Sequence, residues 1–189
     1  MSVPGPDWTN TRLVTQCLAG DQRAWNALLE RYQNLIYSIP RRYGAPHQDA
    51  ADIFQAVCLD LFHELPRLRD AEAIQGWLIR VTTHKCYHWK RRLSSKESEF
   101  GDDQLENLSG VEPIPVQLLV EIEREQTVRE AIAKLPPRCR EMIDLLFFEQ
   151  PAIPYDEVAR RLNVAKGSIG FIRGRCLKRL RKTLEEKGF

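Results

Sequence analysis

Between residues 93 and 117 the sequence loses the hydrophobic periodicity that it shows on both sides. This stretch is rich in Ser, Gly, Pro, Asp and Glu, a composition typical of linkers. On either side, apolar residues recur every three or four positions, as on one face of an α-helix, and no useful length alternates as a strand does. The chain of 189 residues is therefore expected to be all-α, with helical domains at 11–92 and 118–187 joined by the linker 93–117.

Proline and glycine divide both regions into separate predicted helices. Asp21 follows Gly20 and is a residue type that caps helices. Pro40, followed by Gly44-Ala45-Pro46, is expected to end the first helical run, and Pro66 to end the second. The expected helices cover 11–38, 49–63, 73–92, 118–135, 138–149, 155–162 and 168–186.

Charge is sorted along the chain, although the formal net charge is only +2. Residues 80–92 carry +5, residues 94–117 carry −5 and residues 166–187 carry +6. Basic clusters supply the phosphate-neutralising part of nucleic-acid binding, whereas an ordinary solvated helix face is the simpler alternative. Two clusters beside aromatic residues or a turn favour nucleic acid as a partner.

Other function classes lack their signatures in this sequence. The metalloprotease HExxH, the Walker A loop and the hydrolase GxSxG are absent, so we expect no enzyme, no catalytic residue and no cofactor. The five cysteines are widely spaced and odd in number, without CxxC, which argues against a disulfide framework or zinc ribbon and favours a reducing cytoplasm. We also expect no secretory signal and no membrane span, since no apolar run approaches about 20 residues.

Residues 155–182 have the pattern of a helix-turn-helix motif. Val158, Ala159 and Leu162 share one face of the first helix, a turn follows, and Ser168 is placed to cap the second helix. Gly170 and Gly174 in that helix indicate close approach of its backbone either to DNA or to another helix. Ile169, Ile172, Cys176 and Leu180 are expected to pack inward. The predicted DNA-binding residues of this helix and its turn are Lys166, Ser168, Phe171, Arg173, Arg175, Lys178 and Arg179.

In residues 77–92, aromatic and basic side chains alternate. Bases of an unpaired strand stack on aromatic rings, so this segment predicts binding to opened DNA, although Trp77 also suits a core position. His84, Cys86 and His88 lie close in sequence, but the basic surroundings and the missing further ligands make a metal site a minor alternative. A redox role for Cys86 beside Lys85 is another.

Two blocks resemble the sigma-70 class of bacterial sigma factors. The DAADIFQ segment at 49–55, followed by WLIR at 77–80 and a basic helix ending in Arg91-Arg92, resembles region 2. The segments AIAKLPPRCRE and YDEVARRLNVAKGSI resemble region 4. With only a short linker between them, the chain resembles the extracytoplasmic-function (ECF) subgroup over about 11–92 and 118–184.

The resemblance implies binding to core RNA polymerase and promoter DNA, help in strand opening, and a possible anti-sigma factor partner. The polymerase-binding positions that it implies are Asp49, Asp52, Ile53 and Gln55, although Asp49 and Asp52 also suit a helix N-terminus. In the family, the loop matching 66–75 captures an everted base. The implied residues for the downstream (minus-10) element are Arg67, Arg69, Trp77, Arg80, His84, Lys85, His88, Trp89, Lys90, Arg91 and Arg92, and the helix-turn-helix residues above would read the upstream (minus-35) element.

Several positions depart from the family pattern. His84 and His88 stand where Asn and Asp are usual, and Gly170-Phe171-Ile172 replaces a usual Lys-Ser-Arg. The acidic linker resembles a segment that threads through polymerase channels, or it is a solvated tether. Two alternatives stay open: a helix-turn-helix regulator acting on duplex DNA without polymerase, and a protein that titrates polymerase without reading promoters.

Overall fold

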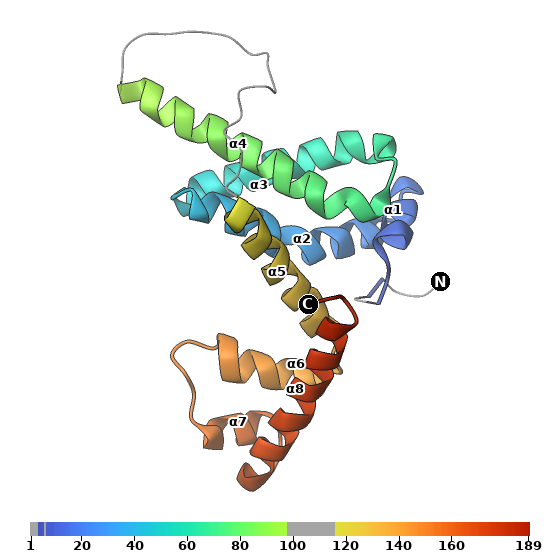
Figure 1. The fold of residues 1–189 in the computed structure, drawn as a ribbon, viewed down its shortest axis with the longest axis vertical. Coiled ribbons are helices and arrows are strands. Elements are labelled where there is room, and N and C mark those ends of the chain that lie inside the picture. The colour runs from blue at the N-terminus through green and yellow to red at the C-terminus, as the bar shows by residue number, and fades with distance from the viewer. Residues whose placement is uncertain (1–3, 6, 98–115) are drawn as a thin grey trace. The chain divides into compact units, whose positions relative to one another are not determined.

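The computed structural model describes residues 4, 5, 7–97 and 116–189, and in this part of the chain every regular element is a helix (Figure 1). This confirms the all-α prediction. Among the described helices, none combines the length and the apolar composition needed to cross a membrane. The α-helices are α1 (Asn10–Leu18), α2 (Gln22–Arg42), α3 (His47–Glu64), α4 (Ile74–Glu97), α5 (Val116–Ala133), α6 (Pro137–Ile143), α7 (Tyr155–Arg161) and α8 (Ile169–Glu185). Shorter turns of helix are η1 (Leu65–Arg67), η2 (Ala71–Ala73), η4 (Asp144–Phe148) and η5 (Lys166–Ser168).

The first predicted helix is two helices. Gly20 has a φ of +83°, in the left-handed region that favours glycine, and α1 ends just before it. Asp21 then caps α2, since its Oδ1 accepts a hydrogen bond from the Arg23 backbone N–H at 2.9 Å. The predicted cap at Asp21 is confirmed, whereas the prediction of one continuous helix over 11–38 is wrong.

Pro40 does not end α2, contrary to the prediction. The helix continues through this buried proline to Arg42, and the reversal comes at Gly44, with a φ of +81°. The Pro40 carbonyl accepts from the Ala45 backbone N–H at 2.9 Å, so the end of the helix stays hydrogen-bonded. Inside the helix, Pro40 removes only the hydrogen bond that a backbone N–H at this position would donate to the Ile36 carbonyl, one turn earlier.

The described residues divide into two compact units, 1–123 and 124–189. We refer to them as unit 1 and unit 2. The sequence placed the start of the second domain at 118, but Leu118, Leu119 and Ile122 of α5 pack against the core of unit 1. At the other end of the expected linker, α4 continues to Glu97, and residues 98–115 lie outside the described part.

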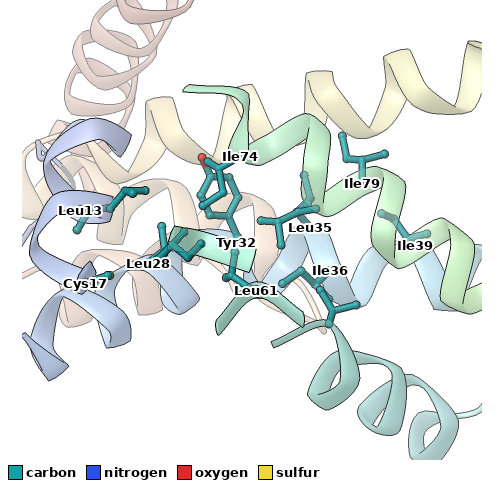
Figure 2. Packing of buried hydrophobic residues seen from close by; sticks show 14 of the residues in the cluster. Leu13, Cys17, Leu28, Tyr32, Leu35, Ile36, Ile39, Leu61, Ile74 and Ile79 are labelled. Atoms are coloured by element: carbon teal, nitrogen blue, oxygen red, sulfur yellow. The ribbon is translucent and has the colours of Figure 1, made fainter. Parts of the chain in front are cut away.

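Unit 1 is organised around α2, which contacts α1, α3 and α4 (Figures 1 and 2). Its buried face carries residues at helical spacing, from Leu28 and Tyr32 to Ile39. Side chains from the other helices, such as Leu61 and Ile74, close this core. Each fully buried Leu or Ile contributes about 1.5–3 kcal/mol, so this face holds the helices that carry the candidate site.

Unit 2 holds the helix-turn-helix. Val158 and Ala159 of α7, and Leu162 at its C-cap, pack with Ile169 of α8 in one cluster, and Val164 of the turn lies partly buried against it. The turn bends at Asn163, whose φ of 51° is a left-handed conformation that asparagine tolerates well. The predicted packing of this motif is confirmed. Its predicted cap is not, because the Ser168 side chain makes no capping hydrogen bond.

Cys139 of α6 and Cys176 of α8 form a disulfide, although the spacing and odd number of the cysteines argued against a disulfide framework. They are 37 positions apart in sequence, but their Cα atoms are 5.2 Å apart because α6 packs on α8. Spacing along the chain says nothing about such proximity, so the sequence offered no signal for the pair. Cys17, Cys58 and Cys86 are unbonded.

Candidate nucleic-acid interface

The outward side of α8 and its turn carries the predicted upstream-element residues. Ile169 and Cys176 are buried, and Ile172 and Leu180 partly so, which leaves the opposite side to solvent. Phe171 is 69% exposed, an unusual place for a large aromatic ring in a folded domain. We name this exposed surface the α8 basic face; it comprises Lys166, Ser168, Phe171, Arg173, Arg175, Lys178 and Arg179, all exposed.

Two cations of the α8 basic face are held by α7. Arg173 Nη1 donates to Tyr155 Oη at 2.7 Å, and Lys166 Nζ lies 2.9 Å from an Asp156 carboxylate oxygen. A third cation, Arg175, has its guanidinium carbon 5.7 Å from the centroid of the Phe171 ring. The sequence did not single out Tyr155 or Asp156, because their spacing from α8 gives no periodic signal.

The two glycines of α8 face open space. A Cβ added at Gly170 or Gly174 would meet nothing within 4 Å, so neither glycine makes room for another helix in the described structure. This removes helix packing as their explanation, and close approach of the α8 backbone to DNA stays a prediction. The α8 basic face is unobstructed at both glycines.

In unit 1, α4 presents its cations outward but buries much of its aromatic surface. Trp89 is 8% exposed and belongs to the core, so it cannot stack on a base, contrary to the prediction; Trp77 is half-buried against the same core. Lys85 Nζ lies 2.7 Å from Asp60 Oδ2 of α3, which orients it and partly neutralises it. Among the α4 residues whose burial the structure describes, up to 93, the exposed cations are Arg80, Lys90, Arg91 and Arg92.

His84 and His88 form a pair on α4. Their Nε2 atoms are 2.9 Å apart, so one ring donates a hydrogen bond to the other. Burial lowers the pKa of His88, and the positive charges of His84, Arg91, Arg92 and Lys85 lower it further. The pair therefore favours a form in which at least one ring is neutral.

Cys86 lies in the core of unit 1, whereas His88 is on the exposed side of α4. Cys86 is fully buried, and burial raises the pKa of its thiol to about 12. Within the described residues, no group of three or more His, Cys, Asp and Glu side chains is arranged to hold a metal ion.

The segment between α3 and α4 is hydrogen-bonded to the first turn of α1. Glu72 accepts hydrogen bonds from Thr11 Oγ1 at 3.1 Å and from Asn10 Nδ2 at 3.4 Å, and Asp70 caps η2 by accepting from the Glu72 N–H at 2.9 Å. Of the predicted residues here, Arg67 pairs with Glu64 at 2.7 Å and Arg69 is exposed. The sequence missed Glu72, which anchors the loop that presents both arginines.

The predicted polymerase-binding residues divide by burial. Asp52 and Gln55 are exposed on one side of α3, Asp49 is half-exposed in the first turn, and Ile53 is buried in the core. Pro46 occupies the N-cap position of α3, which answers the alternative that Asp49 caps the helix. Ile53 therefore supports the helix from behind and is not available as a surface contact.

Two apolar side chains continue the exposed side of α3. Leu59 is 62% exposed and Phe62 is 60% exposed, and both follow Asp52 and Gln55 at helical spacing. The Phe62 ring centroid lies 5.6 Å from that of Trp25 in α2. We name Asp52, Gln55, Leu59 and Phe62 the α3 stripe. In the sequence, Leu59 and Phe62 are apolar residues at a spacing that suits a buried helix face equally well. Only the packing shows that they face solvent.

Comparison with known proteins matches residues 28–96 to the family model described as Sigma-70 region 2. The chain is 27% identical over 186 residues to the ECF RNA polymerase sigma-E factor of Escherichia coli strain K12, covering 95% of this chain and 94% of that protein. It is 26% identical over 178 residues to the RNA polymerase sigma-H factor of Pseudomonas aeruginosa, covering 88% of each.

Among solved structures, the one titled "Structure of CnrH in complex with the cytosolic domain of CnrY" has a TM-score of 0.39 and 22% identity, over 92% of this chain and 96% of that one. The region 2 match covers α3 and α4, and the two curated relatives span both units. The chain is accordingly a member of the sigma-70 class of RNA polymerase sigma factors, in the ECF group.

Proposed function

We propose that this chain acts as a promoter-specificity subunit, binding core RNA polymerase through unit 1 and promoter DNA through both units. The observation that carries the proposal is the presence of one outward basic face in each unit, on α4 and on α8, in a chain of this family. Buried residues lie on the other side of each helix, so packing fixes the backbone that carries the cations. The polymerase would perform the chemistry.

The α8 basic face is the part suited to duplex DNA. A recognition helix places its N-terminal turns against base edges, and the first two turns of α8 carry Phe171, Arg173 and Arg175. Arginine is suited to bidentate contact with guanine, and an exposed aromatic ring is suited to the methyl group of thymine. Lys178 and Arg179 lie further along the helix, where phosphate contact is the expected role.

The cations of α4, together with Arg67 and Arg69, are the part suited to an opened strand. Stacking depends here on Trp77, the half-buried ring of the pair, because Trp89 is in the core. The anchored loop at 65–73 would present its arginines to the same strand. Capture of an everted base in this loop is part of the proposal.

The α3 stripe is the proposed polymerase contact. A carboxylate and an amide followed by two exposed apolar side chains combine polar and apolar contacts on one side of α3, as protein–protein interfaces do. A protein that acts with polymerase at promoters works where the chromosome is, and in a bacterium that compartment is the cytoplasm. Control by an anti-sigma factor stays a prediction of the family resemblance.

Run-off transcription with purified core RNA polymerase across genomic fragments tests the proposal. We expect transcripts from discrete start sites only when this chain is added, and weak DNA binding by the chain alone. Tight, sequence-specific duplex binding with no effect on start-site choice would overturn the proposal in favour of a regulator acting without polymerase. Core binding without any promoter selection would overturn it in favour of a titrating protein.

A further inference from the structure

The Cys139–Cys176 disulfide lies inside the core that supports the recognition helix. Cys139 is 7% exposed and Cys176 is 1% exposed. Both pack with buried Ile132, Leu135 and Ile143 in one cluster. The bond therefore joins two helices through the centre of unit 2.

The position of Cys176 couples this bond to the α8 basic face. Arg175 precedes it, and Lys178 follows two positions later on the same helix. Ile172, one turn earlier, packs against both this cluster and the cluster of the helix-turn-helix. A covalent link at Cys176 thus holds the middle of α8, and the helix-turn-helix core with it, against α6.

The remaining cysteines are poor competitors for oxidation. Burial raises the thiol pKa of Cys17 to about 11 and of Cys86 to about 12, and it raises that of Cys58 as well. Since the thiolate is the reactive form, burial slows the reaction of these three thiols, as it does for the buried Cys139 and Cys176, and what distinguishes the pair is that each has a partner sulfur beside it. Oxidation is expected to concentrate on the pair that the fold has already brought into bonding distance.

We propose that Cys139 and Cys176 form a reversible oxidation site that locks α8 against α6. The inference rests on the proposed function, because a protein that works on promoter DNA shares a reducing compartment, in which disulfides are transient and regulatory. The thiol pair is then the resting form, and oxidative load produces the disulfide seen in the structure.

The chemistry needs only a peroxide or a low-molecular-weight disulfide. With hydrogen peroxide, the Cys139 thiolate attacks one oxygen to give a sulfenic acid and hydroxide; the Cys176 thiol then attacks that sulfur, forming the S–S bond and releasing water. Both sulfurs are oxidised and the peroxide is reduced. A dithiol reverses the reaction by two successive exchanges, leaving two protein thiols and an oxidised dithiol.

The disulfide closes a loop that contains the whole of α7, the turn and the first half of α8. Cross-linking across such a loop lowers the entropy of the opened chain and so favours the assembled motif. We therefore infer that the oxidised form presents the α8 basic face more persistently than the reduced form. The direction is fixed: oxidation strengthens binding of the upstream element.

Thiol counting with hydrogen exchange tests the site on the full chain, without mutation. The protein is equilibrated with dithiothreitol or with glutathione disulfide, denatured and alkylated, and its mass is measured. We expect five alkylated cysteines after dithiothreitol and three after glutathione disulfide, and peptide mapping should assign the protected pair. Amide exchange in α6 and α8 should be at least about tenfold slower in the oxidised form, with α2 and α3 as unchanged internal controls.

Equal labelling in both buffers, or equal exchange of α8 in the two forms, would overturn the proposal. Cys58→Ser in unit 1 is the matched control and should lose one label in both states while keeping the lock. Affinity for an upstream-element duplex, from a promoter mapped by run-off transcription, should rise several-fold on oxidation, and equal affinity would overturn the effect on DNA. If the lock forms but neither form directs transcription, the proposed function fails and the oxidation site stands.

Discussion

Arg173 and Lys166 each contact a side chain of the short helix α7. The Tyr155 hydroxyl accepts from Arg173, and the Asp156 carboxylate pairs with Lys166. An exposed ion pair contributes little to stability, so the consequence of these contacts is orientation. A guanidinium held by a neutral hydroxyl keeps its charge and most of its donors for DNA.

Arg173→Ala is expected to weaken binding to an upstream-element duplex by about 1–3 kcal/mol if the arginine contacts a base. Tyr155→Phe should weaken it by about 0.5–1.5 kcal/mol, since it removes one hydrogen bond and keeps the ring. Fluorescence anisotropy at several salt concentrations measures both, with Tyr37→Phe in unit 1 as the control. A reduced salt slope with unchanged sequence preference would reassign Arg173 to a phosphate.

His88 should make unit 1 less stable at mildly acidic pH. Its pKa is lowered in the folded protein, first by burial and then by the neighbouring positive charges, so the unfolded chain takes up the proton more readily. Above the ordinary histidine pKa of 6.5, His88 leaves the free energy of unfolding unchanged. As the pH drops below 6.5, that free energy falls until the pH passes the pKa of His88 in the folded protein.

Urea unfolding at pH 7.5 and pH 5.5 measures this difference, since all four tryptophans lie in unit 1. His88→Gln should make the loss of stability on acidification smaller, because it removes the titrating group. Gln48→Ala, a change without a titrating group at the exposed start of α3, should leave the pH dependence as it is in the unmodified chain. An identical acid loss in the His88 variant would contradict the assignment.

At the scale of elements, α8 and the α3 stripe expose residues that isolated helices would disfavour. Glycine inside a helix costs about 1 kcal/mol relative to alanine, and α8 carries two in its first half. On α3, large apolar side chains at Leu59 and Phe62 face solvent. Both features fit surfaces that a partner covers, where backbone approach or apolar burial offsets the cost.

Gly174→Ala is expected to stabilise unit 2 by about 1 kcal/mol, because its Cβ meets nothing within 4 Å and alanine is the better helix former. The same substitution should weaken duplex binding if the α8 backbone approaches DNA. Gly20→Ala is the contrasting control in unit 1, where a φ of +83° makes alanine destabilising by about 1–2 kcal/mol. Hydrogen exchange resolves the two units, and anisotropy reports binding.

Asp52→Arg combined with Gln55→Ala should weaken association with core polymerase by about 1–3 kcal/mol, through lost hydrogen bonds and altered charge at the interface. Both side chains are exposed, so the fold should be kept. Gln33→Ala, at an exposed position of α2, is the control. Competition for core enzyme against a labelled unmodified chain measures the effect, and equal competition by the double variant would exclude the α3 stripe as the contact.

At the scale of the whole molecule, each unit has its own core and its own basic face. Substitutions in different units that share no partners should therefore act additively. The two faces also differ in composition: the α8 face carries glycines and an exposed phenylalanine, whereas the α4 face has a half-buried tryptophan beside its cations. This difference predicts that unit 2 binds duplex DNA and that unit 1 binds an opened strand.

Lys90→Ala combined with Arg91→Ala is expected to impair strand opening more than formation of the closed complex. The exposed cations at the end of α4 are placed to hold an unpaired strand, whereas upstream recognition depends on unit 2. Permanganate footprinting measures the opened region, and gel mobility at low temperature measures the closed complex. Equal loss in both assays would assign these residues to duplex binding.

The sequence alone determined the helical class, the two helix-rich regions, the Asp21 cap and the inward residues of α8. These follow from local rules, since apolar periodicity, proline, glycine and capping residues act within a few positions of themselves. For the same reason the region 2 and region 4 motifs are recognisable from the order of their residues. Their cations could be named because charge and helical spacing are both local properties.

Only the tertiary structure decided which of those residues are available and which are joined. Burial of Trp89 and Ile53, exposure of Phe62, the Tyr155–Arg173 hydrogen bond and the Cys139–Cys176 bond all depend on helices far apart in sequence. Packing between helices brings such groups together or covers them, and no short sequence pattern encodes that geometry.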